Sequence, residues 1–307
     1  MQFKRKRGLQ MTKPTLTDPR RIYYTEKFEK QDQDTPALQQ KMDPIPDTGE
    51  DGYSGSDRLK GRRALITGGD SGIGRAAAIA FAKEGADIAI QFLPGEETDA
   101  QKVQECVEKV GQKVVLIPAD LREENITKQI VEDAVAGLGG LDILVLNSAQ
   151  QIAHTAIEDI STKQLKDTFN VNIIAMFTMV QAALPYLPAG SSIITTTSIQ
   201  AFDPSDTLLD YAASKAAIAN FTVGLAKQLA EKGIRVNGVA PGPIWTPLQL
   251  DQGQPQSAIP EFGQDSLMQR AGQPIELAPV YVFLASNDAS YVTAQIYGVT
   301  GGQAINL

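Results

Sequence analysis

Short apolar runs alternate with longer amphipathic stretches along the chain from residue 62 onward. The apolar runs have the length and composition of buried strands: Ala64–Thr67, Asp87–Phe92, Lys113–Pro118, Ile143–Leu146, Ser192–Thr196, Arg235–Ala240 and Gln295–Val299. The stretches between them have helical spacing: Gly74–Glu84, Asp99–Val110, Glu123–Leu138, Thr162–Leu187, Asp210–Lys232 and Pro274–Ala285. Strands that alternate with helices form right-handed crossovers. The pattern therefore predicts one α/β domain over residues 59–307, a doubly wound parallel sheet of about seven strands.

Residues 1–58 differ from the rest of the chain. They are polar and rich in Pro, Asp and Gln, and they carry too few apolar residues to form a core of their own. We predict an extended arm that packs through Tyr23, Tyr24 and Phe28 on the domain or on a neighbouring subunit; disorder is the alternative. The basic residues 1–10 are interpreted as a leader, and no apolar run follows them as in a secretory signal.

Composition excludes several classes of partner and site. The net charge is −8, whereas nucleic-acid binding requires clustered positive charge. Cys106 is the only cysteine and His154 the only histidine, so we expect no internal disulfide and no metal site. The most apolar stretch, 173–187, is interrupted by Gln181 and Pro185 and is shorter than the roughly 18 residues of a membrane span. These features predict a cytoplasmic protein without a membrane or nucleic-acid partner.

A glycine-rich turn follows the first predicted strand. Residues 67–74 read Thr-Gly-Gly-Asp-Ser-Gly-Ile-Gly and lead into an alanine-rich helix. Glycines at such a turn let the backbone approach a pyrophosphate, whose charge suits the free N–H groups at the start of the helix. A plain β-turn can have the same composition. The position between a strand and a helix nevertheless favours a dinucleotide site in a Rossmann-type fold.

The spacing Thr-Gly-x-x-x-Gly-x-Gly resembles the short-chain dehydrogenase/reductase family, whose members have one compact domain. Two later features agree with it: Asp120 after the third strand, and Pro241-Gly242 after the sixth. The arm is also similar to N-terminal extensions in a bacterial general-stress branch described as aldehyde reductases. The resemblance implies that NAD(P)(H) is bound by Gly68, Asp70, Ser71, Gly72, Ile73, Gly74, Asp120, Leu121, Asn147, Ser148, Tyr211, Lys215, Pro241, Gly242, Ile244 and Thr246.

One segment departs from the family pattern. After the fourth strand the family usually has Asn-Asn-Ala-Gly, and this chain has Leu146-Asn147-Ser148-Ala149, in which only Asn147 matches. Ala149 lacks the freedom of glycine at positive φ. Backbone contacts to the adenosine ribose are compatible with this departure, so the sequence predicts the fold here but leaves the cofactor affinity open.

Tyr211 and Lys215 are one helical turn apart, so their side chains lie on one face of the predicted helix 210–232. With Ser198 and Asn172 they match the family's Asn-Ser-Tyr-Lys tetrad. The resemblance implies that Tyr211 transfers the proton and that Ser198 orients the substrate oxygen. It also implies that Lys215 holds the nicotinamide ribose and that Asn172 supports a water relay. An ammonium about 5 Å from Tyr211 supplies roughly 3 kcal/mol at an effective dielectric of about 20, so we expect a pKa lowered toward neutrality.

Two further expectations concern the substrate and the choice of cofactor. The segment 243–270 is expected to cover the substrate, with Trp245 in contact, although an ordinary surface loop has the same composition. The second strand ends in the run 91–94, Gln-Phe-Leu-Pro, without the basic residue that a 2′-phosphate requires. We therefore expect NAD(H) rather than NADP(H), with Gln91 or Ser71 able to bond a ribose hydroxyl.

Together these features predict an oxidoreductase that transfers a hydride between NAD(P)(H) and a small carbonyl or alcohol, such as an aldehyde or ketone reductase. A non-catalytic dinucleotide-sensing module and a sugar dehydrogenase of the same family are alternatives. A serine hydrolase would need Ser198 and His154, and a sugar-nucleotide epimerase would need a larger region after Pro241. Small apolar residues around helix 210–232 predict a homo-oligomer, and the family implies a tetramer.

Overall fold

A parallel sheet of seven strands forms the centre of the computed structural model, which describes residues 16–123 and 125–305. The strand order is β3-β2-β1-β4-β5-β6-β7. The strands are β1 (Arg63–Thr67), β2 (Asp87–Phe92), β3 (Val114–Pro118), β4 (Ile143–Leu146), β5 (Ser192–Thr196), β6 (Arg235–Pro241) and β7 (Ile296–Val299). The predicted doubly wound sheet is confirmed. The chain reverses direction along the sheet between β1 and β4, and a crevice forms there at the carboxyl ends of the strands.

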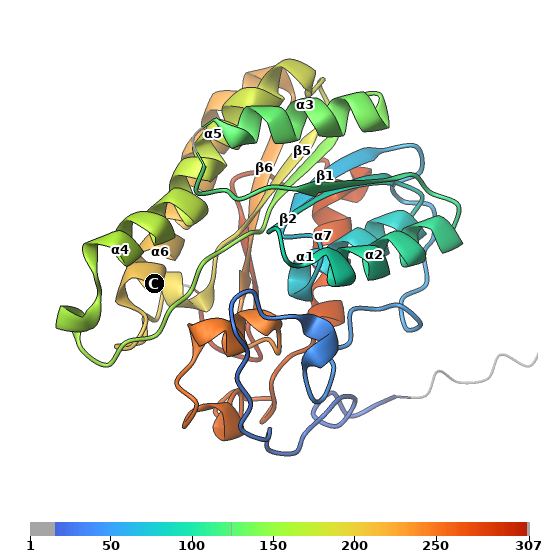
Figure 1. Ribbon diagram of the computed structural model, residues 1–307. Coiled ribbons are helices and arrows are strands. Elements are labelled where there is room, and N and C mark those ends of the chain that lie inside the picture. The colour runs from blue at the N-terminus through green and yellow to red at the C-terminus, as the bar shows by residue number, and fades with distance from the viewer. Residues whose placement is uncertain (1–15, 124, 306–307) are drawn as a thin grey trace, which may run out of the picture.

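Helices cover both faces of the sheet (Figure 1). One face carries α1 (Gly72–Lys83), α2 (Glu97–Lys109) and α7 (Ala278–Ala285). The other carries α3 (Ile126–Leu138), α5 (Ala175–Ala183) and α6 (Leu209–Leu229). Because side chains alternate along a strand, Ile66 points into the first of these layers and Leu65 into the second.

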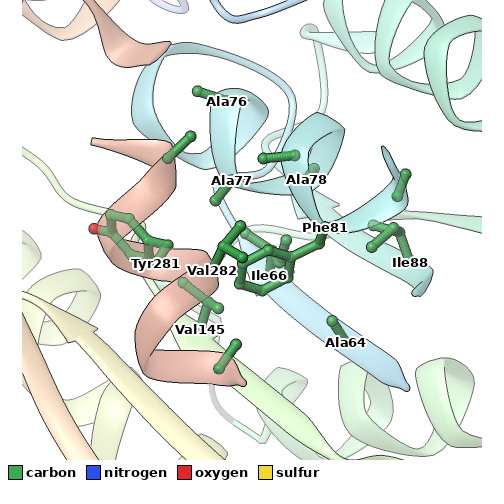
Figure 2. Close-up of a cluster of buried hydrophobic side chains, with 14 of the residues drawn as sticks. Ala64, Ile66, Ala76, Ala77, Ala78, Phe81, Ile88, Val145, Tyr281 and Val282 are labelled. Carbon is green, nitrogen blue, oxygen red and sulfur yellow. The ribbon is translucent and has the colours of Figure 1, made fainter. Parts of the chain in front are cut away.

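Small residues allow α1 to lie close to the sheet and to α7. Ala76, Ala77 and Ala78 are fully buried, and Phe81 of the same helix packs among apolar side chains of β1, β2 and α7 (Figure 2). The start of α1 is thereby fixed against the end of β1. That junction contains the glycine-rich turn.

The predicted helix over 162–187 is divided in the structure. It consists of α4 (Thr162–Phe169), a π-helical turn η3 (Asn170–Ile174), α5, and a 3-10 turn η4 (Leu184–Tyr186). Among the described residues, the stretch Thr162–Tyr186 is the one helix long and apolar enough to cross a membrane; it has 25 residues, and an 18-residue window within it has a mean hydropathy of 1.2. It packs on α3 and α6 as a covering helix of the sheet.

Residues 16–58 form the arm, whose described part contains a single 3-10 turn, η1 (Gln39–Lys41). The arm runs beside the segment 243–270 at the lower edge of the fold (Figure 1). Phe28 is buried and stacks on Trp245, with ring centroids 3.8 Å apart. Tyr23 lies over Arg270, while Tyr24 stacks on Phe28 and stays 37% exposed. The arm is therefore extended and packed on the domain of its own chain; the leader predicted at residues 1–10 lies outside the described residues.

Candidate active site

A cavity of about 990 Å³ opens at the carboxyl ends of β1 to β6. Its size suits a dinucleotide together with a small substrate. Three of the predicted cofactor, catalytic and substrate residues do not line it: Gly74, Asn172 and Trp245. All the other predicted cofactor and catalytic residues do, so the fold brings together positions that are far apart in the chain.

The glycine-rich turn is tightly packed, and this explains its glycines. A Cβ on Gly74 would come within 1.9 Å of the carbonyl oxygen of Gly68. Gly72 has a φ of +50°, which favours glycine. The side-chain amide of Asn147 donates to the carbonyl oxygen of Gly68 at 3.2 Å. The result is a fixed cradle at the N-terminus of α1 that fits a pyrophosphate.

The segment after β4 has an ordinary backbone at Ala149. This residue is not among those with positive φ, so the conformational freedom of glycine is not needed there. The backbone N–H groups of Asn147 and Ser148 donate to Oγ1 of Thr67, at 2.9 and 3.1 Å. These backbone bonds join the ends of β4 and β1 and do not use the side chains of Ser148 and Ala149, which differ from the family pattern.

Gln91 joins three loops at the floor of the cavity. Its side-chain oxygen accepts from the Gly68 N–H at 3.2 Å and from the Ser148 hydroxyl at 3.0 Å. Its amide donates to the carbonyl oxygen of Ala119 at 2.7 Å. The sequence suggested Gln91 as a ribose ligand; in the structure its oxygen is already occupied by protein donors. Its position near the end of a buried strand was the only signal for this structural role.

The end of the cavity nearest β2 and β3 is acidic. Burial raises the pKa values of Asp70 and Glu96. The negative charge of Asp99 raises both pKa values further, and that of Asp70 also raises the pKa of Glu96. Asp120 is paired with Arg122, whose hydrogen bonds lower the pKa of this carboxyl. Besides Arg122, two cationic side chains line the cavity in the described chain. Lys163 is paired with Asp167 on its own helix, and Lys215 is buried.

Tyr211, Lys215 and Ser198 meet at the other end of the cavity. Tyr211 and Lys215 lie on the first turns of α6 and are almost completely buried. The Lys215 ammonium nitrogen donates to the backbone oxygen of Thr196 at 2.8 Å. Ser198 follows β5 as the N-cap of η5 (Ile199–Ala201), and its oxygen accepts from the Gln200 N–H at 3.1 Å.

The pKa values in this cluster differ from the expectation. Burial raises the pKa of Tyr211 to about 12, and the Ser198 side chain opposes this only in part. Burial also lowers the pKa of Lys215 to about 7. The predicted fall in the Tyr211 pKa was wrong because desolvation disfavours both charged forms, and a lysine that loses its charge no longer stabilises a phenolate.

Asn172 lies behind the cavity, in the π-helical turn η3. Its side-chain oxygen accepts from the Gln150 N–H at 2.7 Å, and its amide donates to the Ser214 hydroxyl at 2.9 Å. Asn172 thus joins the helix turn, the loop after β4 and α6, on which Lys215 lies. Its side chain positions other residues and does not line the cavity.

The structure corrects the expected substrate contact of Trp245. Ile244 and Thr246 face the cavity, and because side chains alternate along an extended segment, Trp245 points the other way. It is fully buried against the arm, with its indole N–H donating to the Pro44 oxygen at 2.8 Å. His154 also lies outside the lining, bonded to Gln164 at 2.6 Å. A histidine-activated Ser198 therefore has no support.

Comparison with known proteins identifies the family. Residues 68–304 match the family model described as Enoyl-(Acyl carrier protein) reductase. The uncharacterized oxidoreductase YghA of Escherichia coli (strain K12) is 59% identical over 288 residues, or 94% of this chain and 98% of the relative. The chain belongs to the short-chain dehydrogenase/reductase family. Its activity is that of an oxidoreductase acting between CH–OH and C=O groups with a nicotinamide cofactor.

Other relatives of this oxidoreductase refine the picture. General stress protein 39 of Bacillus subtilis (strain 168) is 47% identical, over 88% of this chain and 94% of the relative. NADPH-dependent aldehyde reductase 1, chloroplastic, of Arabidopsis thaliana is 45% identical, over 88% and 96%. These two agree with the predicted general-stress and aldehyde-reductase branch.

Solved structures with bound cofactor have the same fold. A short-chain dehydrogenase from Burkholderia cenocepacia in complex with NADP superposes with a TM-score of 0.74 at 33% identity, over 80% of this chain and 99% of its own. A short-chain dehydrogenase from Mycobacterium paratuberculosis bound to NAD gives 0.71 at 30% identity, over 80% and 98%. Both nicotinamide cofactors therefore occur among the structural neighbours of this oxidoreductase.

Proposed function

We propose that this oxidoreductase reduces small aldehydes or ketones, with Tyr211 as the proton donor. The observation that supports this most is the buried Tyr211 hydroxyl at the cavity, whose pKa is raised to about 12. Such a phenol keeps its proton at neutral pH and can give it to a carbonyl oxygen that gains negative charge. The relative named as an aldehyde reductase supports the same direction and substrate class.

The residues of the cavity then have separate tasks. The glycine-rich turn, Asp120 and the Pro241-Gly242 turn hold the cofactor, which when bound supplies the hydride to the carbonyl carbon. Tyr211 supplies the proton at the carbonyl oxygen, so that C=O becomes CH–OH. Ser198 orients that oxygen. Lys215 holds the nicotinamide ribose, and Lys215→Ala is expected to lose both turnover and cofactor affinity.

The test is an absorbance assay in both directions: oxidation of NADH and NADPH with a panel of aldehydes and ketones, and reduction of NAD+ and NADP+ with sugars and sugar alcohols. Turnover of aldehydes or ketones by the wild type is expected. Cofactor binding without turnover of any substrate would instead indicate a dinucleotide-sensing module. Oxidation of glucose or ribitol with no aldehyde reduction would favour a sugar dehydrogenase, as in the relative named glucose and ribitol dehydrogenase of Daucus carota, 44% identical over 88% of this chain.

The same assay tests the choice of cofactor, for which we infer NAD(H). The β2 end of the cavity carries Asp70 and Glu96 and, in the described chain, no cation without an acidic partner. A dianionic 2′-phosphate placed there would be costly to desolvate. We expect kcat/KM to be higher with NADH than with NADPH. A tenfold preference for NADPH on the same substrate would overturn this inference.

We also propose a cytoplasmic homotetramer. Ile174, Phe177 and Leu165 are 43–53% exposed on α4, η3 and α5, next to α6, which the sequence predicts at a subunit interface. Ile174 and Phe177 are three positions apart in one helical stretch, and exposed apolar side chains that gather on one face mark protein–protein contacts. The chain has one cysteine, Cys106, and a chain without a structural disulfide suits a reducing compartment.

A further inference from the structure

The arm forms part of the wall of the cofactor cavity. Thr35 and Ala37 line it together with Asp70 and Glu96. Pro36 lies against the loop that follows β2, since a Cβ on Gly95 would come within 3.0 Å of its ring. The arm therefore crosses from the segment 243–270 to the loop after β2, at the end of the cavity nearest the glycine-rich turn.

One arm side chain bonds directly to the glycine-rich turn. The oxygen of the Gln39 side chain accepts from the Gly72 N–H at 2.7 Å. Ser71, the residue at the N-cap of α1, has no capping hydrogen bond of its own. Free N–H groups at a helix start need an acceptor. Gln39 supplies one from 33 positions earlier in the chain.

Gln39 is itself held in place. It is 1% exposed, and its backbone N–H donates to the buried Asp99 carboxylate at 2.6 Å. Arg75 of α1 lies 3.8 Å from the same carboxylate. The side-chain amide of Gln39 donates to the Thr48 hydroxyl at 3.4 Å. The contact with Gly72 is therefore part of a buried network that joins the arm, α1 and α2.

The arm lies outside the part of the chain shared with the solved neighbours. The family model begins at residue 68, and the neighbour with bound NADP matches 99% of its own length while covering 80% of this chain. The relatives at 59% and 47% identity extend further, over 94% and 88% of this chain. A contact between the arm and the glycine-rich turn is thus an addition to the shared fold.

We propose that arm residues 35–41 form one wall of the cofactor site, stabilised further when cofactor binds, and that Gln39 is a positioning residue for the glycine-rich turn. By accepting from the Gly72 N–H, Gln39 fixes the turn before the cofactor arrives. The remaining N–H groups of the turn then point to the cofactor without a further loss of conformational freedom. This applies to either nicotinamide cofactor and so does not depend on the NAD(H) inference.

The test compares Gln39→Met, which keeps the volume and removes the acceptor, with Gln31→Met. Gln31 is an equivalent arm residue whose side chain bonds only to arm backbone at Glu29 and Asp43. Cofactor Kd is measured by nicotinamide fluorescence, and kcat and the cofactor KM by steady-state assay. We expect Gln39→Met to raise Kd and KM about 5- to 30-fold, the upper part of the range of a lost helix cap, with kcat within about twofold. Gln31→Met should change neither by more than about twofold.

A second measurement on the wild type covers the case in which Gln39→Met does not fold. Saturating NADH or NADPH should slow amide hydrogen exchange in a peptide covering residues 33–42 as well as in one covering the glycine-rich turn. Unchanged exchange in the arm peptide, with protection of the turn, would overturn the proposal. So would a folded Gln39→Met protein that binds cofactor as the wild type does. Cofactor binding with no turnover of any substrate would contradict only the reductase function.

Discussion

The Lys215 ammonium nitrogen lies 5.3 Å from the centre of the Tyr211 ring, and both side chains are buried at one end of the cavity. This geometry is the one that the spacing of the two residues on a helix requires. Its electrostatic effect depends on burial. Tyr211 keeps its proton at neutral pH, while a Lys215 pKa of about 7 makes its charge sensitive to pH and to an anion bound nearby.

Tyr211→Phe should abolish most turnover and leave the fold and cofactor binding intact. The change removes only the hydroxyl that donates the proton, which contributes roughly 10²- to 10⁴-fold to the rate. Steady-state kinetics on an active aldehyde, together with cofactor Kd, check this. A variant with nearly wild-type kcat would show that Tyr211 is not the proton donor.

Lys215→Met should change the pH dependence of stability. The folded pKa of Lys215 is about 7 and its unfolded value is 10.5, so between these values the unfolded chain binds the extra proton. Lys215 therefore makes the free energy of unfolding rise with pH by about 1.4 kcal/mol per pH unit in this window. Met fills the same space without a charge, so the variant should be the more stable protein at pH 7 or below.

Urea unfolding of both proteins at several pH values from about 6.5 to 9 measures this difference. As the pH rises by two units, the free energy of unfolding of the wild type should increase by roughly 3 kcal/mol relative to that of Lys215→Met. If the free energies of unfolding of the two proteins change with pH in the same way, Lys215 is charged in the folded protein over the whole pH range, and the prediction is wrong.

Glu84→Gln should destabilise the contact between the arm and α1. Burial alone would raise the Glu84 pKa, but hydrogen bonds from Arg58, Tyr53 and the backbone of Ser56 outweigh it and lower the pKa to about 2 from 4.5. The stabilisation is present above the unfolded pKa and is lost as pH falls between these values. It amounts to about 3 kcal/mol at neutral pH.

Thermal or urea unfolding checks the Glu84 prediction. The stability gap between Glu84→Gln and the wild type should narrow as the pH is lowered from about 5 toward 3. Asp57→Asn is a suitable control, because Asp57 pairs with Lys60 on the surface and should contribute less than about 1 kcal/mol. A gap that is constant with pH would indicate a packing effect in place of a charge effect.

Ile174→Glu should disrupt the proposed tetramer without unfolding the protomer. Ile174 is 53% exposed in the turn between α4 and α5, so a charge there is tolerated in the protomer and is costly only at an interface. Light scattering should show a smaller assembly. Ile157→Glu, at a position 67% exposed outside that face, should leave the assembly unchanged. A wild type that is monomeric at micromolar concentration would contradict the oligomer itself.

The sequence by itself determined the elements and the local motifs. The predicted strands agree with the observed ones to within one residue at each end. Both sites predicted from short motifs also line the same cavity: the glycine-rich turn, through residues 68 and 70–73, and Tyr211 with Lys215. These features depend on interactions between residues a few positions apart, such as strand periodicity, the lack of a Cβ in glycine and the helical turn, and a local pattern records them.

Only the tertiary structure decided the features that depend on distant segments. The contact of Gln39 with Gly72 joins residues 33 positions apart, and no periodicity or motif marks it. Trp245 was assigned to the wrong side of its segment because its partner, Phe28, lies in the arm. The pKa direction of Tyr211 was likewise missed, since desolvation depends on every atom packed around a group. Burial is a property of the complete fold, whereas spacing is a property of the chain.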